Sequence, residues 1–160
     1  MTPTAGLIVV SDRVASGARE DASLPLMRER LEPAYRIVRA VVIPDDPGAL
    51  QAELIDLADT GAAQLVLTTG GTGVGPRDRT PQATAAILDY EVPGIAEAIR
   101  AYGRERVPTA ILSRALAGVR ARTLIVNLPG HPRAVSDALD VILPVIPHAL
   151  ALLAGETVEH

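Results

Sequence analysis

Acidic and arginine side chains beside a run of glycines are the residues of this sequence most suited to chemistry. Residues 68–80 read TTGGTGVGPRDRT, so four glycines precede Arg77, Asp78 and Arg79. Glycines let the backbone approach a ligand closely, and its N–H groups then bind an anion. A second acidic pair, Asp45 and Asp46, lies between two prolines. Carboxylates on stiff loops are suitable ligands for Mg²⁺. The arginine guanidinium forms bidentate hydrogen bonds with two phosphate oxygens. The pattern indicates transfer at phosphorus, where catalysis is mainly positioning and charge neutralisation.

Two common nucleotide-binding loops are excluded by residue type and spacing. A P-loop requires a lysine after its last glycine, but every basic residue in this sequence is an arginine. A dinucleotide fingerprint needs G-x-G-x-x-G, whereas Gly71 and Gly73 are followed by Pro76 where the third glycine belongs. The G-x-S-x-G and H-E-x-x-H motifs are also missing. The three histidines are too scattered to predict a metal triad: His131, His148 and His160.

The composition predicts an α/β protein. Apolar residues make up 48% of the 160 residues but aromatic residues only 2%, so the core must be aliphatic, as in parallel strands buried on both faces. The few aromatics and the net charge of −4 argue against a nucleic-acid partner. The absence of cysteine excludes disulfides and thiolate metal sites. The length predicts one domain over residues 1–160, and the lack of a leader or a long apolar segment predicts a cytoplasmic protein without membrane contact.

Strands and helices are expected to alternate along the chain. Buried strands are predicted at residues 6–10, 36–43, 65–67 and 123–128, with a short extended piece at 108–113 and a loop over 14–21. Helices are predicted at residues 24–31, 48–57, 80–90 and 93–102, and from residue 134 onward. Thr80 is the expected N-cap of the third of these helices, with Pro81 in its first position. Pro144 and Pro147 divide the last region into two pieces or a kinked one.

The polar segments of the chain are expected to meet at one edge of a parallel sheet. Strands that alternate with helices form such sheets through right-handed crossovers, and ligands bind outside the carboxyl ends of the strands. Five segments that are polar, small or glycine-rich follow the predicted strands or extended piece: residues 11–13, 45–46, 68–78, 113–114 and 127–131. Their convergence predicts a ligand site built from several loops.

Structural roles for the same residues stay open at this point. The glycines could form a tight structural turn. Asp78 could form a salt bridge to a neighbouring arginine, and Asp45 could form a turn between its flanking prolines. Three further polar residues suit either a ligand site or local capping and loop bonding: Ser11, Asp12 and Asn127.

Five segments together resemble one protein family. They are TGGTG-x-x-x-RD-x-TP at residues 69–81, SDR at 11–13, IPDD at 43–46, PTAILSR at 108–114 and NLPG at 127–130. In this order they are similar to the Mog/MoaB family of molybdenum cofactor biosynthesis, and to the G domains of gephyrin and its plant counterpart. The resemblance covers nearly the whole chain. It implies a three-layer αβα sandwich with a mostly parallel sheet, assembled as a homotrimer.

The resemblance also implies a molybdopterin adenylyltransferase. In that reaction the terminal phosphate of molybdopterin attacks the α-phosphate of MgATP, giving adenylyl-molybdopterin and pyrophosphate. Asp45 and Asp78 match the two catalytic aspartates, which would bind Mg²⁺, and Ser113 matches a serine that contacts pterin or nucleotide. His131 stands where relatives often carry a small or amide residue, and we expect it at the pocket rim. The predicted substrate contacts are Ser11, Asp12, Thr69, Gly70, Gly71, Thr72, Gly73, Arg77, Ser113, Asn127, Pro129 and Gly130.

Other functions compatible with the same fold stay open. A MoaB-type protein would bind molybdopterin as a carrier or scaffold without efficient transfer. A hydrolase acting on nucleotides is a more distant alternative, because a domain of this fold also occurs in the CinA group, and an NAD-dependent dehydrogenase ranks last. A molybdenum insertase is the expected protein partner, and the sequence does not separate a molybdenum pathway from a tungsten pathway.

Overall fold

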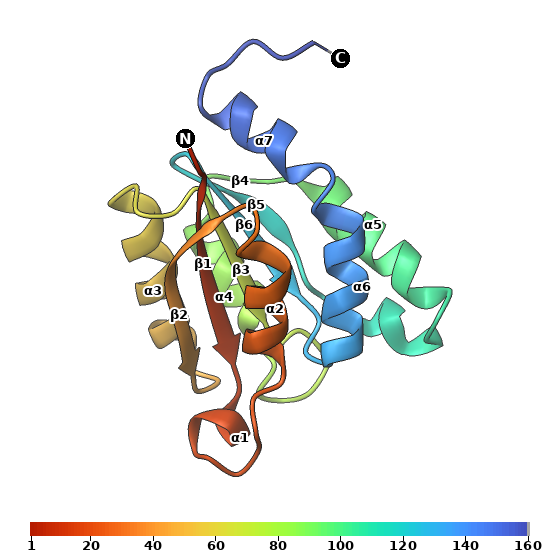
Figure 1. Cartoon of the computed structure of the whole chain (residues 1–160). Coiled ribbons are helices and arrows are strands. Elements are labelled where there is room, and N and C mark those ends of the chain that lie inside the picture. Colours follow the sequence, from red (N-terminus) through yellow and green to blue (C-terminus); the bar gives the residue numbers. More distant parts are fainter. Residues whose placement is uncertain (160) are drawn as a thin grey trace.

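A six-stranded sheet forms the centre of the structure, a computed structural model that describes residues 1–159. The strand order is β2-β1-β3-β6-β5-β4 (Figure 1). The strands are β1 (Thr4–Val10), β2 (Arg36–Ile43), β3 (Leu65–Thr69), β4 (Tyr90–Glu91), β5 (Ala117–Arg120) and β6 (Thr123–Leu128).

Helices cover both faces of this sheet (Figure 1). On one face α3 (Pro47–Asp59) and α4 (Thr80–Ile87) pack against the side chain of Ile8 and its neighbours. The opposite face, with Leu7 and Val9, is covered by α2 (Ser23–Leu31), α5 (Pro93–Arg104), α6 (Pro132–Ile142) and α7 (Ile146–Leu153). Alternate strand residues therefore enter two separate aliphatic cores. The predicted three-layer αβα sandwich is confirmed.

Four strands of the sheet are parallel and end together. The register pairs Val10 with Ile43, Val9 with Thr69, and Thr69 with Leu128, so β1, β2, β3 and β6 have their carboxyl ends at one edge. This edge lies at the lower end of Figure 1, where α1 (Asp12–Ala15) follows β1. Since β2 and β3 lie on opposite sides of β1, the chain reverses its winding direction here, and such points bind ligands in α/β sheets.

The other two strands are antiparallel and were not predicted. β5 runs against β6, and β4 runs against β5. β5 has only four residues, AGVR, of which Val119 alone is β-branched, so its pattern is too short to stand out. Because β5 is antiparallel, its start lies beside the carboxyl end of β6. Ser113 and Arg114 therefore reach the predicted edge, although they precede a strand and do not follow one.

Two predicted elements differ from the structure. Residues 108–113 do not form an extended piece: Pro108–Leu112 is a 3-10 helix, η1, because Pro108 has the φ of a helical first residue and Ser113 N–H donates to Ala110 O at 3.1 Å. The helix predicted to reach Tyr90 ends at Ile87, since Leu88 turns to an extended conformation with ψ of 144°. Tyr90 then pairs with Val119 in the sheet.

The predicted loop over residues 14–21 begins with the last residues of α1. Ser11 caps this short helix by accepting a hydrogen bond from Val14 N–H at 3.2 Å, which confirms the capping alternative for Ser11. At the other end of the chain, the region with Pro144 and Pro147 forms two helices, as predicted. Within residues 1–159 no single helix is long and apolar enough to cross a membrane; α6 and α7 reach that length and composition only as a pair bent by 62°.

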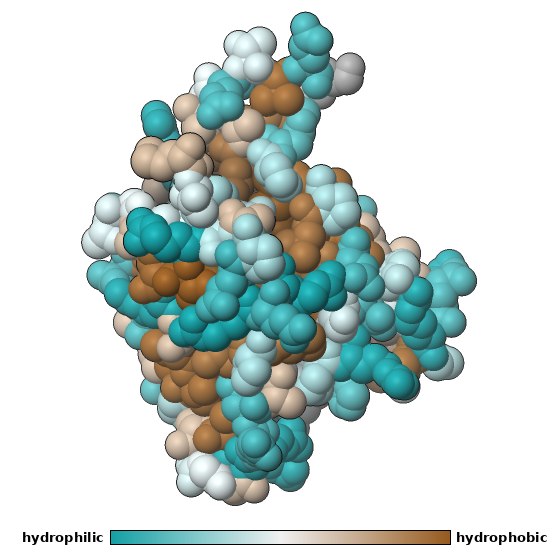
Figure 2. Space-filling model, in the orientation of Figure 1, coloured by the Kyte–Doolittle hydropathy of each residue, from teal (hydrophilic) through white to brown (hydrophobic). Residues whose placement is uncertain are grey.

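The edge strand β2 is the least covered strand of the parallel group. Its residues are half-buried or exposed, whereas all five residues of β3 are buried. Apolar residues accordingly reach the surface over β2 at the lower left of Figure 2. Of the two catalytic candidates, Asp45 follows this edge strand, and Asp78 follows β3 on the other side of β1.

Candidate functional site

The glycine loop after β3 lies directly on the end of β1. Gly70 and Gly71 have φ of 95° and 67°, a backbone region that favours glycine. A Cβ on Gly70 would overlap the Val10 carbonyl oxygen, and a Cβ on Gly71 would overlap the Thr80 hydroxyl. Thr69 Oγ1 donates to Pro129 O at 2.5 Å and joins the loop to the NLPG segment. Both positions therefore require glycine, because of their positive φ and because a Cβ would overlap neighbouring atoms.

Asp45 is held by a reciprocal contact with Asp12. Asp45 Oδ2 accepts from Asp12 N–H at 3.0 Å, and Asp12 Oδ1 accepts from Asp45 N–H at the same distance. Arg77 reaches across from the glycine loop, with Nε 2.6 Å from Asp12 Oδ2. Asp46 caps α3 by accepting from Gly48 N–H at 3.0 Å, which gives its side chain a structural role. Three loops far apart in sequence thus position one carboxylate.

Acid is expected to weaken this connection between the loops. The Arg77 guanidinium, and after it the Asp45 N–H, holds the pKa of Asp12 below its ordinary value of 3.8. A carboxyl with a lowered folded-state pKa stabilises the fold above its unfolded-state pKa and loses that effect as the pH falls through the folded-state pKa. We expect the urea midpoint to fall between roughly pH 5 and pH 3, and Asp12→Asn to remove part of that fall.

The matched control is Glu97→Gln. Glu97 is an exposed acid on α5 whose side chain makes no hydrogen bond or ion pair within residues 1–159. We expect its pH dependence of unfolding to match that of the unmodified protein. An Asp12→Asn variant that also follows the unmodified curve would show that the Asp12–Arg77 pair adds nothing to stability.

Asp78 folds back onto the glycine loop. Its Oδ2 accepts from Gly75 N–H at 2.8 Å, so the alternative of a salt bridge to Arg77 or Arg79 is not the observed arrangement. The Arg114 guanidinium donates to Asp78 O at 2.6 Å and to Gly73 O at 2.8 Å. The sequence placed Arg114 in the polar segment 113–114, but no role was predicted for its side chain. Its signal was an arginine at the ligand edge, directly after Ser113.

Two cavities meet at this edge. One of about 340 Å³ is lined by both aspartates and by the predicted residues Ser11, Thr69, Gly70, Gly71 and Gly130. Another of about 660 Å³ has an apolar wall and the predicted residues Gly71, Thr72, Gly73, Ser113, Pro129 and Gly130. Asp78, Gly71, Gly130 and His131 line both. The structure therefore brings nearly all of the predicted site residues to two adjoining spaces.

Three predicted contact residues do not line either cavity. Asn127 is fully buried, and its Nδ2 donates to Thr68 Oγ1 at 2.9 Å and to Thr84 Oγ1 at 3.1 Å. The prediction of a substrate contact is corrected for Asn127, whose side chain ties β6 to β3 and α4. Asp12 and Arg77 bind each other outside both cavities, so the structure places them as supports for Asp45.

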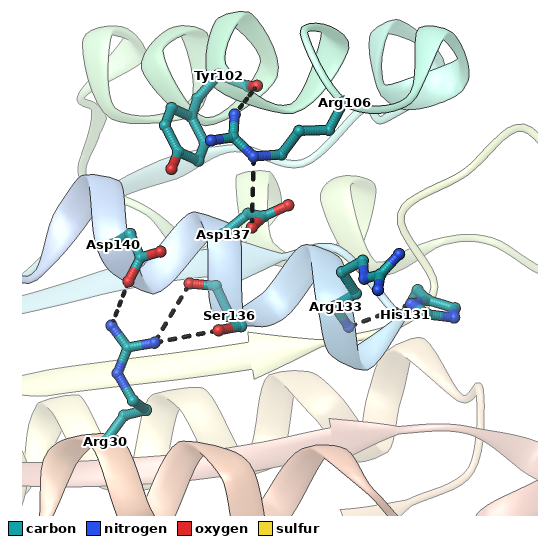
Figure 3. A network of polar contacts seen from close by, with 8 residues as sticks. All are labelled: Arg30, Tyr102, Arg106, His131, Arg133, Ser136, Asp137 and Asp140. Carbon is teal, nitrogen blue, oxygen red and sulfur yellow. Dashed lines mark hydrogen bonds and ion pairs between the residues drawn. The ribbon is translucent and has the colours of Figure 1, made fainter.

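The last loop of the site leads into α6, which forms ion pairs with two arginines. Arg30 of α2 contacts Asp140 at 2.6 Å, and Arg106 lies 3.7 Å from Asp137 (Figure 3). Arg30 lies in α2, and Arg106 follows the end of α5; both helices cover the same face of the sheet as α6. Because such partly exposed ion pairs contribute little, α6 is held mainly by its buried apolar residues.

His131 caps α6 and lies at the rim, as predicted. Its Nδ1 accepts from Arg133 N–H at 3.2 Å (Figure 3). This hydrogen bond assigns the ring proton to Nε2 in the neutral imidazole. His148 lies in α7, half-buried. His160, expected to be a free terminus, lies outside the described residues.

The acidic pair offers Mg²⁺ two carboxylate ligands from the protein. No group of three or more His, Cys, Asp or Glu side chains within residues 1–159 can hold a metal ion. Asp45 and Asp78 reach one cavity as a pair, and Mg²⁺ commonly uses one or two carboxylates while substrate phosphates complete its shell. Gly71 keeps the space beside Asp45 Oδ1 open, since a Cβ there would lie 3.2 Å from that oxygen. The donor set fits.

A family model and individual proteins match the chain. Residues 6–148 match the family described as "Probable molybdopterin binding domain". The molybdopterin adenylyltransferase of Escherichia coli (strain K12) is 38% identical over 169 residues, covering 96% of this chain and 87% of the relative. The molybdenum cofactor biosynthesis bifunctional protein of Synechococcus elongatus is 43% identical over 152 residues, covering 94% of this chain and 47% of the relative.

A solved structure shows the same fold. The molybdopterin biosynthesis enzyme MoaB from Thermus thermophilus superposes with a TM-score of 0.89 at 44% sequence identity, covering 98% of this chain and 99% of the MoaB chain. Since the superposition covers 98% of this chain, the site described above lies within the shared fold.

Proposed function

The chain belongs to the molybdopterin-binding domain family, and we propose that it is a molybdopterin adenylyltransferase of molybdenum cofactor biosynthesis. The observation that carries this proposal is the pair of cavities that share Asp78 and Gly71. A transfer between two substrates needs two binding spaces with a common wall, because the reacting atoms must approach closely. Family membership supplies the substrates, molybdopterin and ATP.

The chain's own residues supply positioning and charge. The backbone around Gly70, Gly71 and Gly73 approaches the phosphates closely, and the α4 N-terminus adds the positive end of its dipole. A terminal phosphate oxygen of molybdopterin attacks the ATP α-phosphorus, the bond to the β-phosphate breaks, and pyrophosphate leaves. The attacking phosphate is ionised, so no base has to remove a proton from it. In-line positioning is then the main task of the protein.

Asp45 and Asp78 are proposed to hold Mg²⁺ at the cavity that they share. When bound, the ion neutralises the charge that develops on the phosphate oxygens. The protein contributes the fixed orientation of the two carboxylates. Asp45 is oriented by Asp12 N–H and Asp78 by Gly75 N–H.

Several wider expectations stay proposals. We propose one domain over residues 1–160, a homotrimer, a cytoplasmic location and no binding to nucleic acid or membranes. A molybdenum insertase is proposed as the partner that receives the product. Support comes from the Synechococcus relative, in which a segment like this chain makes up about half of a bifunctional protein of the same biosynthesis.

Transfer is tested directly by mixing the protein with molybdopterin, ATP and Mg²⁺. We expect pyrophosphate and adenylyl-molybdopterin to form in equal amounts, followed by a coupled pyrophosphate assay and by mass spectrometry. The control omits molybdopterin and measures the pyrophosphate that is released from ATP alone. Pyrophosphate at that background level would contradict the proposed activity.

This assay and two further ones, with a dinucleotide and with NAD, separate the alternative functions. Molybdopterin binding without turnover would favour the carrier or scaffold. Release of AMP from a dinucleotide, with no pterin present, would favour the nucleotide hydrolase. Binding of NAD would be required for a dehydrogenase, and its absence would remove that alternative.

A further inference from the structure

Thr80 carries a polar atom that the site described so far does not use. The side chain is 3% exposed, and its hydroxyl is the one buried side-chain polar atom without a hydrogen-bond partner within residues 1–159. The prediction that Thr80 caps α4 is wrong: Arg79 occupies the N-cap position, Thr80 is the first helical residue, and no side chain caps the helix. A buried hydroxyl without a partner is rare in native proteins and needs an explanation.

The surroundings of this hydroxyl point toward Asp45. The position that a Cβ on Gly71 would take overlaps Thr80 Oγ1 and lies 3.2 Å from Asp45 Oδ1. The two oxygens thus border the same small volume, which stays open because residue 71 is glycine. Asp45 and Thr80 also line a space of about 10 Å³, room for about one water-sized group.

The orientation of Asp45 leaves one carboxylate oxygen available. Oδ2 accepts from Asp12 N–H at 3.0 Å, whereas Oδ1 faces the volume beside Gly71. A hydroxyl can donate to a carboxylate, and such charge-assisted bonds are strong. A bond from Thr80 would hold Asp45 from a second side and restrict the rotation of its carboxylate.

We propose that Thr80 is a positioning residue, whose hydroxyl donates to Asp45 Oδ1 when Mg²⁺ and nucleotide occupy the site. This inference rests on the proposed adenylyl transfer, because it assigns Asp45 to the Mg²⁺ site. Residues that orient a metal ligand change metal affinity or activity by about 10–100-fold when they are replaced. No protein group within residues 1–159 satisfies the hydroxyl, so a bond to Asp45 would supply the partner that it lacks.

The test compares Thr80→Val, which replaces the hydroxyl by a methyl group of similar size, with Thr80→Ser, which keeps it. Each full-length variant is titrated with Mg²⁺ in the presence of α,β-methylene-ATP by isothermal titration calorimetry, so that no turnover is needed. We expect Thr80→Val to weaken Mg²⁺ binding by about 10-fold and Thr80→Ser to restore it. Nucleotide binding without Mg²⁺ should be unchanged in both.

Thermal unfolding supplies the second readout. Removing an unpaired buried hydroxyl should leave the melting temperature of the ligand-free Thr80→Val protein unchanged or raised. A lowered melting temperature together with unchanged Mg²⁺ affinity would overturn the inference and assign Thr80 a structural role. If transfer fails in the unmodified protein while Thr80→Val still weakens Mg²⁺ binding, the proposed function fails and the inference on Thr80 stands. If transfer proceeds and both variants bind Mg²⁺ normally, the proposed function stands and the inference on Thr80 fails.

Discussion

Replacing Asp78 with asparagine is expected to lower the rate of adenylyl transfer by about 10²–10³-fold, with molybdopterin binding largely retained. Asparagine keeps an oxygen that can accept from Gly75 N–H, a bond of 2.8 Å in the structure, so the loop should hold its shape. The substitution removes the negative charge from the wall that the two cavities share. The measurement is kcat for pyrophosphate release, with molybdopterin binding measured separately by calorimetry.

Asp46→Asn is the matched control for this variant. It removes the same charge from a neighbouring loop, and asparagine caps a helix about as well as aspartate does. Asp46 lies outside both cavities, so activity should stay close to that of the unmodified protein. Full activity in Asp78→Asn would remove Asp78 from the metal role, and a loss of molybdopterin binding alone would assign it to substrate binding.

Replacing Gly70 with alanine is expected to destabilise the fold by about 2–5 kcal/mol. Two effects add. The residue has φ of 95°, which costs a non-glycine residue roughly 1–2 kcal/mol. The new Cβ would also overlap the Val10 carbonyl oxygen, a backbone atom that cannot move without displacing β1, and overpacking of this kind costs about 1–3 kcal/mol. Urea unfolding followed by circular dichroism measures the sum.

Gly17→Ala isolates the first of these effects. Gly17 has φ of 81°, yet a Cβ there would meet nothing within 4 Å. We expect this variant to lose about 1–2 kcal/mol, the conformational cost alone. Equal losses in the two variants would mean that the glycine loop moves away from β1 without penalty, and the close approach would then carry no stability.

The parallel part of the fold follows from the sequence because its signals are local. Short apolar runs such as residues 65–67 are typical of strands buried on both faces, and prolines and glycines mark where they end. The rule that parallel strands end at one edge then brings Asp45 and Asp78 together without knowledge of any contact. The glycine and aspartate motifs likewise identified the family that the comparisons confirm.

The antiparallel strands and 3-10 helix η1 escaped prediction for the opposite reason. β4 has two residues and β5 four, so neither contains a period long enough to recognise. β5 is held by its pairing with the buried strand β6, and β4 by its pairing with β5. A weak local preference is overridden by such tertiary contacts.

What the sequence by itself determined is the set of chemical groups, their order and the edge at which they meet. Only the tertiary structure decided which of them bond to one another. Arg77 binds Asp12 across 65 residues, and Asn127 binds Thr68 across 59 residues. Such partners depend on loop paths and strand register, and no local pattern encodes them. The same holds for Thr80, whose hydroxyl has no partner within residues 1–159 and borders the same volume as Gly71 and Asp45.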